Sequence, residues 1–129
     1  MRSCGILMHI SSLPSPYGIG TFGAEAEKFA DWLKEAGQKY WQVLPIGPTG
    51  YGDSPYQPFS SFAGNPLLID LDELVEHGYL AKKSLDNSDY GADPSYVDFD
   101  IVNRNKTALL REAFAGFTDD VGYTSFVIE

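Results

Sequence analysis

Cysteine, histidine and basic residues are scarce in this sequence of 129 residues, and each shortage excludes a class of site. With one cysteine, Cys4, the chain has no internal disulfide and no cysteine-rich zinc cluster. The two histidines show no metal-ligand spacing with the acids, so no metal site is expected. Lysine and arginine number 9 against 18 acidic residues, and the net charge of −9 argues against a nucleic-acid partner or an anionic membrane surface.

Long apolar runs are also absent, since no stretch approaches the roughly 20 residues of a membrane span. The apolar run that follows Arg2 ends at His9, which is too short for a signal peptide. We therefore expect a cytoplasmic protein. In that setting Cys4, which lies within an apolar run, is expected to be a buried structural thiol. The 43% hydrophobic content fits one globular domain.

Two short apolar runs with a helical pattern between them predict a βαβ unit. Residues 4–10 (CGILMHI) form a continuous apolar run, which is typical of a strand buried on both faces, and residues 40–46 (YWQVLPI) form a second. Between them, residues 22–37 repeat apolar side chains at helical spacing, with Thr21 as the expected N-cap and Gly37 as the stop. Such a unit joins parallel strands by a right-handed crossover.

The lengths of the connections indicate which end of these strands is functional. Only residues 37–39 join the helix to the second strand, whereas about ten and about twenty residues follow the two strands. This asymmetry is typical of (β/α) barrels and open α/β sheets, which place ligands at the carboxyl ends of their strands. The segment 47–66 is therefore expected on the functional face.

Beyond this segment the pattern is mainly helical. We expect a short helix capped by Asp70 or Asp72 and closed by Gly78, a loop with one helical turn, and an amphipathic helix over residues 100–117. A last helix is expected to begin at 118–120 and to be cut off in mid-pattern. Because two parallel strands cannot close a barrel, the chain is expected to be a fragment of something larger. The predicted buried stripe of the long helix consists of Val102, Leu109, Ala113, Phe114 and Phe117.

The glycines of GIGTFG (residues 18–23) match the dinucleotide fingerprint G-x-G-x-x-G, but their setting does not. Seven residues, two of them proline, separate the first strand from Gly18, where the fingerprint has almost none. The second strand ends in Leu44-Pro45-Ile46, without the acid that binds a ribose hydroxyl. A dinucleotide-binding oxidoreductase is therefore the least favoured alternative.

Ser54 and His9 are the candidates for nucleophilic hydrolysis. Ser54 lies in GDSPY, which lacks the second glycine of a nucleophile elbow. His9 ends the first strand, either as a satisfied core histidine or as a polar group at a ligand site, and spacing does not separate the two. A serine–histidine pair without a third partner gives a hydrolase little support.

The segment 50–66 (GYGDSPYQPFSSFAGNP) combines aromatic rings, short polar side chains, glycines and prolines. Sugars present flat apolar C–H faces and a rim of hydroxyl groups, so their sites need rings for stacking and small hydrogen-bonding groups. Tyr51 and Tyr56, beside glycine and proline, are expected to face a ligand, whereas Phe59 and Phe62 are expected to anchor the loop in the core. The composition predicts a carbohydrate site.

For two polar residues of this loop, hydrogen bonding within a turn is an alternative to ligand binding. Asp53 is either a turn residue whose carboxylate accepts nearby backbone N–H groups or a contact to the ligand. Asn65, just before Pro66, is expected to bind the backbone of its own turn.

Three longer strings, HISSLPSPYGIGTFG, YWQVLPIGPTGYGDSPYQ and FSSFAGNPLLIDL, closely resemble the amino-terminal region of the 4-α-glucanotransferases, the amylomaltase family related to the α-amylases. The resemblance implies the amino-terminal part of a (β/α)8 TIM barrel with an inserted helical subdomain. Residues 1–66 would form the first two β/α units, including a substrate loop at 47–66. Residues 67–129 would form a mainly helical insertion, truncated at its carboxyl end.

The same resemblance implies a function in starch or glycogen metabolism. Members transfer α-1,4-glucan segments from a donor to an acceptor maltodextrin or glucose, with retention and without metal or organic cofactor. The implied partners are maltodextrins, amylose and the rest of the parent polypeptide. A second hypothesis treats the chain as a stand-alone glucan-binding module, because stacking and hydrogen bonding do not need catalytic acids.

Residue by residue, the resemblance reaches the substrate site but not the catalytic one. Ser54 and Tyr56 resemble contacts to sugars on the non-reducing side of the cleavage point, and Tyr51 resembles part of an accessory glucan surface. Together with His9 and Asp53, they make up the expected substrate-binding residues. The three catalytic carboxylates of the family belong to later barrel strands, so no residue here is expected to be catalytic.

Overall fold

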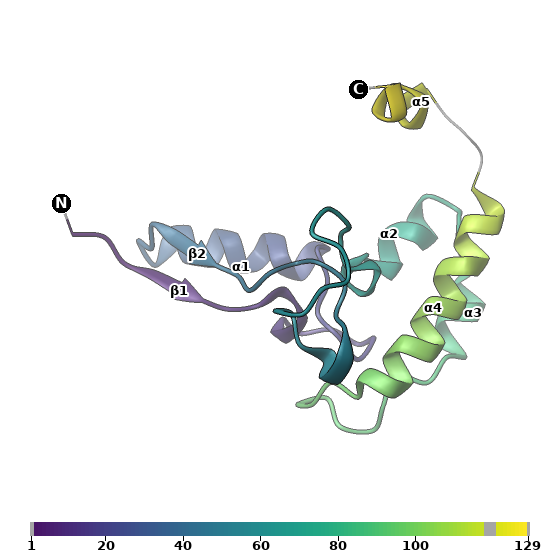
Figure 1. Cartoon of the computed structure of the whole chain (residues 1–129), viewed down its shortest axis with the longest axis horizontal. Helices are drawn as coiled ribbons and strands as arrows, with labels where there is room; N and C mark the ends of the chain where they lie inside the picture. The colour runs from purple at the N-terminus through teal and green to yellow at the C-terminus, as the bar shows by residue number, and fades with distance from the viewer. Residues whose placement is uncertain (1, 118–120, 129) are drawn as a thin grey trace.

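The computed structural model describes residues 2–117 and 121–128, which run from an extended amino-terminal part to a helical carboxyl-terminal part (Figure 1). In the described residues, no helix is both long and apolar enough to cross a membrane. Three 3-10 turns, η1 (Ile10–Ser12), η2 (Tyr51–Asp53) and η3 (Pro66–Leu68), lie in the connections. The strands and helices are β1 (Gly5–Leu7), α1 (Ala24–Glu35), β2 (Tyr40–Gln42), α2 (Leu71–Glu76), α3 (Lys82–Asp86), α4 (Phe99–Gly116) and α5 (Val121–Ile128).

Strands β1 and β2 are parallel neighbours, which confirms the predicted βαβ unit. Gly5 lies opposite Tyr40, and a Cβ atom at Gly5 would collide with the Tyr40 carbonyl oxygen. The indole N–H of Trp41 donates to the carbonyl of Met8 at 2.8 Å. The Trp41 ring also packs edge-on against Phe29 of α1, with ring centroids 4.9 Å apart. Helix α1 is thereby fixed beside the strand pair.

The strands are shorter and more exposed than predicted. β1 has three residues where the sequence predicts seven, Leu7 is 58% exposed, and Cys4 is exposed instead of buried. A buried parallel strand needs neighbouring strands and helices over both faces. Within the described residues, β1 has one neighbouring strand. The apolar run therefore forms a surface that this part of the chain leaves uncovered.

Helix α1 begins two residues later than predicted, at Ala24, with Gly23 as its N-cap. Thr21 is not the cap; it is buried, and its hydroxyl donates to Asp70 Oδ2 at 2.5 Å. A Cβ atom at Gly23 would collide with the same carboxylate. Asp70 itself caps α2, as expected, because its Oδ1 accepts the backbone N–H of Glu73 at 3.1 Å. This carboxylate joins the start of α1 to the start of α2.

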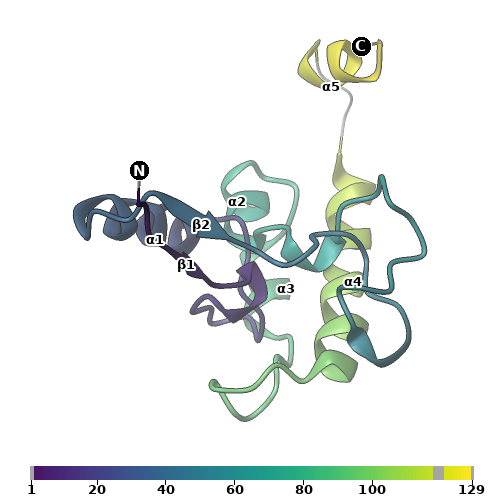
Figure 2. The same cartoon turned by 60° about the vertical axis from the view of Figure 1, so that its left-hand side comes forward.

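Helices α2, α3 and α4 gather to one side of the strand pair (Figure 2). Helix α4 begins after Asp98, whose carboxylate accepts the N–H of Ile101 at 3.1 Å. Its predicted apolar stripe is confirmed at the buried Val102, but Phe114 is 77% exposed. The predicted start of the last helix, at 118–120, lies outside the described residues. The largest buried cluster consists of Tyr17, Leu71, Leu80, Leu85, Leu109 and Ala113.

Candidate substrate-binding loop

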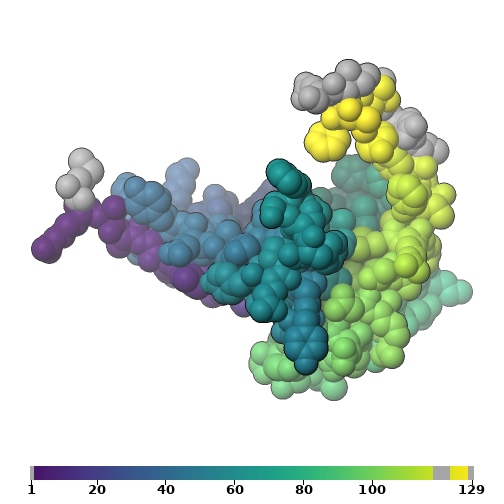
Figure 3. Space-filling model, viewed as in Figure 1, coloured from purple at the N-terminus to yellow at the C-terminus, as the bar shows by residue number. Residues whose placement is uncertain are grey.

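The segment 47–64 is a loop whose two ends are held together. The backbone N–H of Asn65 donates to the carbonyl of Ile46 at 2.8 Å, which closes the loop at its base. The side chain of Asn65 accepts the N–H of Leu67 at 3.0 Å, as predicted, and Leu67 is buried against Val102 of α4. In Figure 3 the loop stands in front of the rest of the molecule, between the strands and α4. It projects from a fixed base, as compact surface loops with a function often do.

The first half of the loop is a tight turn around η2. Gly52 and Asp53 have φ angles of +71° and +54°, in the left-handed region. A Cβ atom at Gly50 would collide with the carbonyl oxygen of Gln57, so the two sides of the turn lie in contact. The hydroxyl of Ser54 accepts the backbone N–H of Tyr56 at 3.3 Å. This turn brings the residues predicted to bind the sugar into one short segment.

Of the two alternatives for Asp53, the turn residue whose carboxylate accepts backbone N–H groups does not fit the structure. Within the described chain its carboxylate accepts no hydrogen bond, and the turn is closed by its backbone N–H, which donates to the carbonyl of Gly50 at 3.2 Å. Aspartate is one of the few residues other than glycine that tolerate the left-handed region. The backbone therefore accounts for this residue in the turn and leaves its carboxylate free for a ligand.

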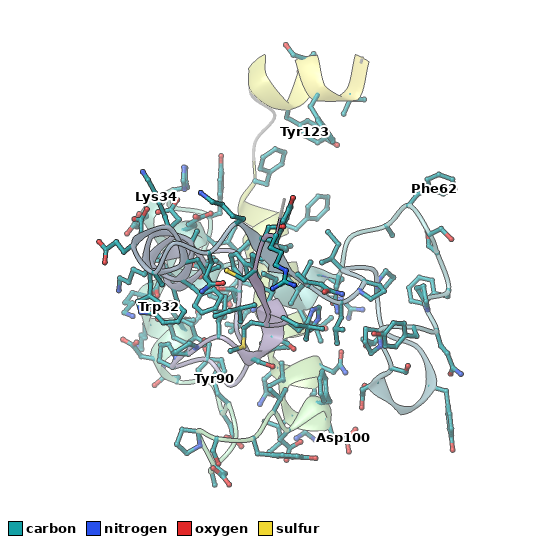
Figure 4. The ribbon with its side chains drawn as sticks, turned by 90° about the vertical axis from the view of Figure 1, so that its left-hand side faces the viewer. Trp32, Lys34, Phe62, Tyr90, Asp100 and Tyr123 are labelled. Atoms are coloured by element: carbon teal, nitrogen blue, oxygen red, sulfur yellow. The ribbon has the colours of Figure 1, made fainter. Side chains whose placement is uncertain are left out.

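The four aromatic rings of the loop are exposed. Tyr51 is 96% exposed and Tyr56 is 68% exposed, as expected for rings that face a ligand. Phe59 and Phe62, which were predicted to anchor the loop in the core, are 81% and 100% exposed, so that prediction is wrong. Figure 4 shows Phe62 at the outer tip of the loop. The buried Leu67 and its neighbour in η3 anchor the loop instead, and each of the four rings is accessible to a partner or ligand.

The second half of the loop encloses a hollow of about 410 Å³, lined by residues 45–47, Pro58 and residues 60–64. Its far wall is a turn in which the hydroxyl of Ser60 accepts the N–H of Phe62 at 3.3 Å and that of Ala63 at 3.2 Å. Hollow and rings lie on the same loop, so a ligand in the hollow would lie beside exposed aromatic surface.

His9 lies between β1 and η1 and is half-buried. Its Nδ1 is buried and has no hydrogen-bond partner among the described residues, and burial lowers the pKa of His9. A neutral imidazole with a free ring nitrogen can form one more hydrogen bond. Of the two alternatives left open by the sequence, the satisfied core histidine does not fit. No hydrogen bond in the described part of the chain joins His9 to Ser54 or Tyr56, so the structure does not link the three.

A buried polar group in α4 was not predicted from the sequence. Lys106 is fully buried, and its Nζ has no hydrogen-bond partner among the described residues. Burial lowers the pKa of Lys106 to about 8, and the charge of Asp70 partly opposes this effect. The helical spacing does indicate this burial, because Lys106 lies one turn after Val102 and one turn before Leu109 on the apolar stripe of α4. In the same described residues, no cluster of histidine, cysteine or acid is arranged to hold a metal ion.

Comparison with known proteins decides the family. The family model described as 4-alpha-glucanotransferase matches residues 8–127. The chain belongs to the 4-alpha-glucanotransferase family. It is 53% identical over 118 residues to the 4-alpha-glucanotransferase of Thermus thermophilus, a match covering 92% of this chain and 23% of the relative. It is 49% identical over 122 residues to that of Clostridium butyricum, covering 93% and 25%.

This chain also matches part of a solved amylomaltase structure. The amylomaltase from Streptococcus agalactiae in complex with acarbose superimposes with a TM-score of 0.90 at 44% identity, over 98% of this chain and 26% of that chain. The mixed strand and helix fold described above is therefore that of part of an amylomaltase. The chain spans about a quarter of the length of the relatives it matches.

Proposed function

We propose that this chain forms one wall of the glucan cleft of a 4-α-glucanotransferase, which moves α-1,4-glucan segments from a donor to an acceptor maltodextrin or glucose. The observation that carries the proposal is the loop 47–64, with four exposed rings on a closed and buried base, in a chain of this family. The complex of the matched amylomaltase with acarbose supports a carbohydrate as ligand.

We propose that residues 1–66 are the first two β/α units of a (β/α)8 barrel and that residues 67–129 belong to a helical insertion. The parallel pairing of β1 with β2 supports this, and so does the loop that follows β2, because barrels place substrate loops at the carboxyl ends of their strands. Leu7 and Tyr40 are 58% and 65% exposed on the strands. In a barrel, further strands and helices would cover such faces.

In this proposal each loop residue has a defined task toward the sugar. The ring of Tyr56 stacks on a donor glucosyl unit, the hydroxyl of Ser54 and the free carboxylate of Asp53 bind sugar hydroxyls, and Tyr51 serves an outer glucan surface. His9, which follows β1, is proposed to contribute its half-buried imidazole to the same substrate site.

The covalent chemistry is assigned to carboxylates outside these residues. An aspartate attacks the anomeric carbon while a glutamate protonates the leaving oxygen, and a third carboxylate supports the distorted transition state. The 4-hydroxyl of another glucan, instead of water, then releases the glycosyl group from the enzyme, which restores the original configuration.

The product distribution tests this function. An enzyme built on this chain is expected to convert maltotriose into glucose and longer maltodextrins, with little net hydrolysis, because the acceptor is a sugar. Chromatography of the products resolves the two outcomes. If glucose and maltose from attack by water were the only products, the enzyme would be an amylase and the proposal would be wrong.

A stand-alone glucan-binding module is the second candidate, and the exposure of all four loop rings favours it. Calorimetric titration of maltoheptaose into the 129-residue chain separates it from the first. A saturable heat that disappears in Tyr56→Ala would support a module that binds by itself. If millimolar maltoheptaose gave no heat and did not protect the chain against unfolding, this candidate would be excluded. The chain as the cleft wall of a larger enzyme would then be the remaining hypothesis.

In the complete enzyme, Tyr56→Ala is expected to lower kcat/KM for maltotriose by roughly 5- to 150-fold. The substitution removes an aromatic platform worth about 1–3 kcal/mol, and about 1.4 kcal/mol corresponds to a factor of ten. Tyr56→Phe should keep most of the activity if stacking dominates and should lose it if the hydroxyl positions the sugar. Initial rates on maltotriose to maltoheptaose measure both.

Tyr51→Ala serves as the matched comparison. It should spare maltotriose and change the behaviour on amylose, since only long chains reach an outer surface. Both tyrosines are largely exposed, so neither substitution should lower the melting temperature by more than a few degrees. If Tyr56→Ala left the kinetics unchanged and lowered the melting temperature, this ring would belong to the core and not to the site.

A further inference from the structure

A second hollow, of about 460 Å³, lies between the loop after β1 and the turn before α4. Residues 11–15, 18–20 and 94–97 line it, and none of the substrate loop 47–66 contributes. The lining contains four serines and one tyrosine but no charged residue. Its volume falls within the range of small-molecule sites, about 300–1,000 Å³. The chemistry that it offers is hydroxyl groups and one ring.

The wall formed by residues 11–20 is held in place by close backbone contacts. A Cβ atom at Gly18, which has a φ angle of +75°, would collide with the carbonyl of Tyr90. A Cβ atom at Gly20 would collide with the carbonyl of Ile10, and the N–H of Gly20 donates to the carbonyl of Ser11 at 3.1 Å. These contacts fix the backbone of the wall against the chain behind it.

The opposite wall is a turn closed by its own side chains. Asp93 Oδ1 accepts the backbone N–H of Ser95 at 2.8 Å and its hydroxyl at 2.6 Å, and these hydrogen bonds lower the pKa of Asp93. The N–H of Tyr96 donates to the carbonyl of Asp93 at 3.2 Å. The turn presents Tyr96 at the hollow with 71% of its surface exposed. The turn fixes the backbone at Tyr96, and the exposed ring is accessible for stacking on a ligand.

Two hydroxyls of the lining have no hydrogen-bond partner in the described part of the chain. Ser11 and Ser12 form no side-chain hydrogen bond among the described residues, and each hydroxyl can donate once and accept twice. Without a charged residue in the lining, an anion or a cation would gain no ion pair and would lose hydration. A neutral ligand with several hydroxyls and a flat apolar face fits both the ring and the serines.

We propose that this hollow binds a neutral hexose unit, with the Tyr96 ring against the sugar face and the Ser11 and Ser12 hydroxyls on its rim. The identification of that unit as a glucosyl residue of an α-1,4-glucan rests on the proposed function. The preference for a neutral polyhydroxylated ligand rests on the lining alone. The site is separate from the loop 47–64, so one chain would hold a glucan at two places.

NMR titration of the 129-residue chain with maltotriose tests the proposal, with backbone amide signals of residues 11–20 and 94–97 as the readout. We expect these signals to shift along a saturable curve. Tyr96→Ala should raise the dissociation constant fitted to that curve at least fivefold. Tyr56→Ala should leave this dissociation constant within twofold of the unsubstituted value. The same is expected of Phe114→Ala, which removes a similarly exposed ring outside both sites. Retained amide dispersion of α4 in Tyr96→Ala shows that the fold is intact.

The pattern of shifts separates this inference from the proposed function. Shifts confined to residues 47–66 would overturn the second site and leave the substrate loop standing. Shifts confined to residues 11–20 and 94–97 would support the second site and count against the loop. Glycerol at a matched hydroxyl concentration is the specificity control, and equal shifts with glycerol would overturn the proposal. The absence of any shift at residues 11–20 and 94–97 would also overturn it.

Discussion

Between pH 8 and 10.5, Lys106 is expected to add about 3 kcal/mol to the free energy of unfolding, and Lys106→Met should abolish this contribution. Burial lowers the pKa of Lys106 from 10.5 to about 8. In this pH window the unfolded chain keeps a proton that the folded chain has released, so stability rises with pH. At about 1.4 kcal/mol for each pH unit, the interval corresponds to the stated gain. Below pH 8 both states carry the charge, and the folded state bears the full cost of burying it.

Urea unfolding of both proteins from pH 6 to 11 measures this difference. Subtracting the Lys106→Met curve cancels groups common to both, among them Tyr17, whose pKa is raised to about 12 by burial and by Asp72. Methionine fills a similar volume without a charge, so Lys106→Met is expected to be the more stable protein at pH 7. Lys106→Ala should instead be less stable, because it leaves a cavity. A difference curve that does not change with pH would show that water reaches the Nζ.

The parts of the fold that sequence predicts correctly depend on neighbouring residues. The helical spacing of α4, the Asp70 cap of α2 and the Asn65 turn are set by contacts within about four residues, and all three are confirmed. The parallel pairing of β1 with β2 follows from the helical pattern between two apolar runs, because a strand–helix–strand unit joins parallel strands. The same local evidence placed Tyr51 and Tyr56 on an exposed loop.

The errors concern what covers an apolar side chain. Hydrophobicity predicts that Cys4, Phe59 and Phe62 prefer burial, but it does not state whether the chain supplies the covering surface, and in the described residues all three are exposed. Polar contacts between residues far apart in the sequence are also not predicted by local patterns. The hydrogen bond between Thr21 and Asp70 joins residues 49 positions apart, and no spacing rule connects them.

Asp70→Ala is expected to destabilise the fold by about 2–4 kcal/mol, because one carboxylate interacts with three elements. It accepts the Thr21 hydroxyl at 2.5 Å, it caps α2 through the N–H of Glu73, and its charge favours the ammonium form of Lys106. Loss of an N-cap alone costs about 1 kcal/mol, and leaving the buried Thr21 hydroxyl without its charged acceptor costs about 1–3 kcal/mol. Thermal or urea unfolding at pH 7 measures the sum.

Asp70→Asn isolates the charge from the hydrogen bonds. Asparagine is an equally good N-cap and still offers an oxygen to the Thr21 hydroxyl, so the remaining loss reports the interaction with Lys106. In the Lys106→Met background that loss should shrink, since no ammonium is left to stabilise, and the two substitutions should therefore be non-additive by about 1 kcal/mol or more. Equal losses in the two backgrounds would contradict the coupling. Asp70 would then act through its hydrogen bonds alone, and another group would have to offset the charge of Lys106.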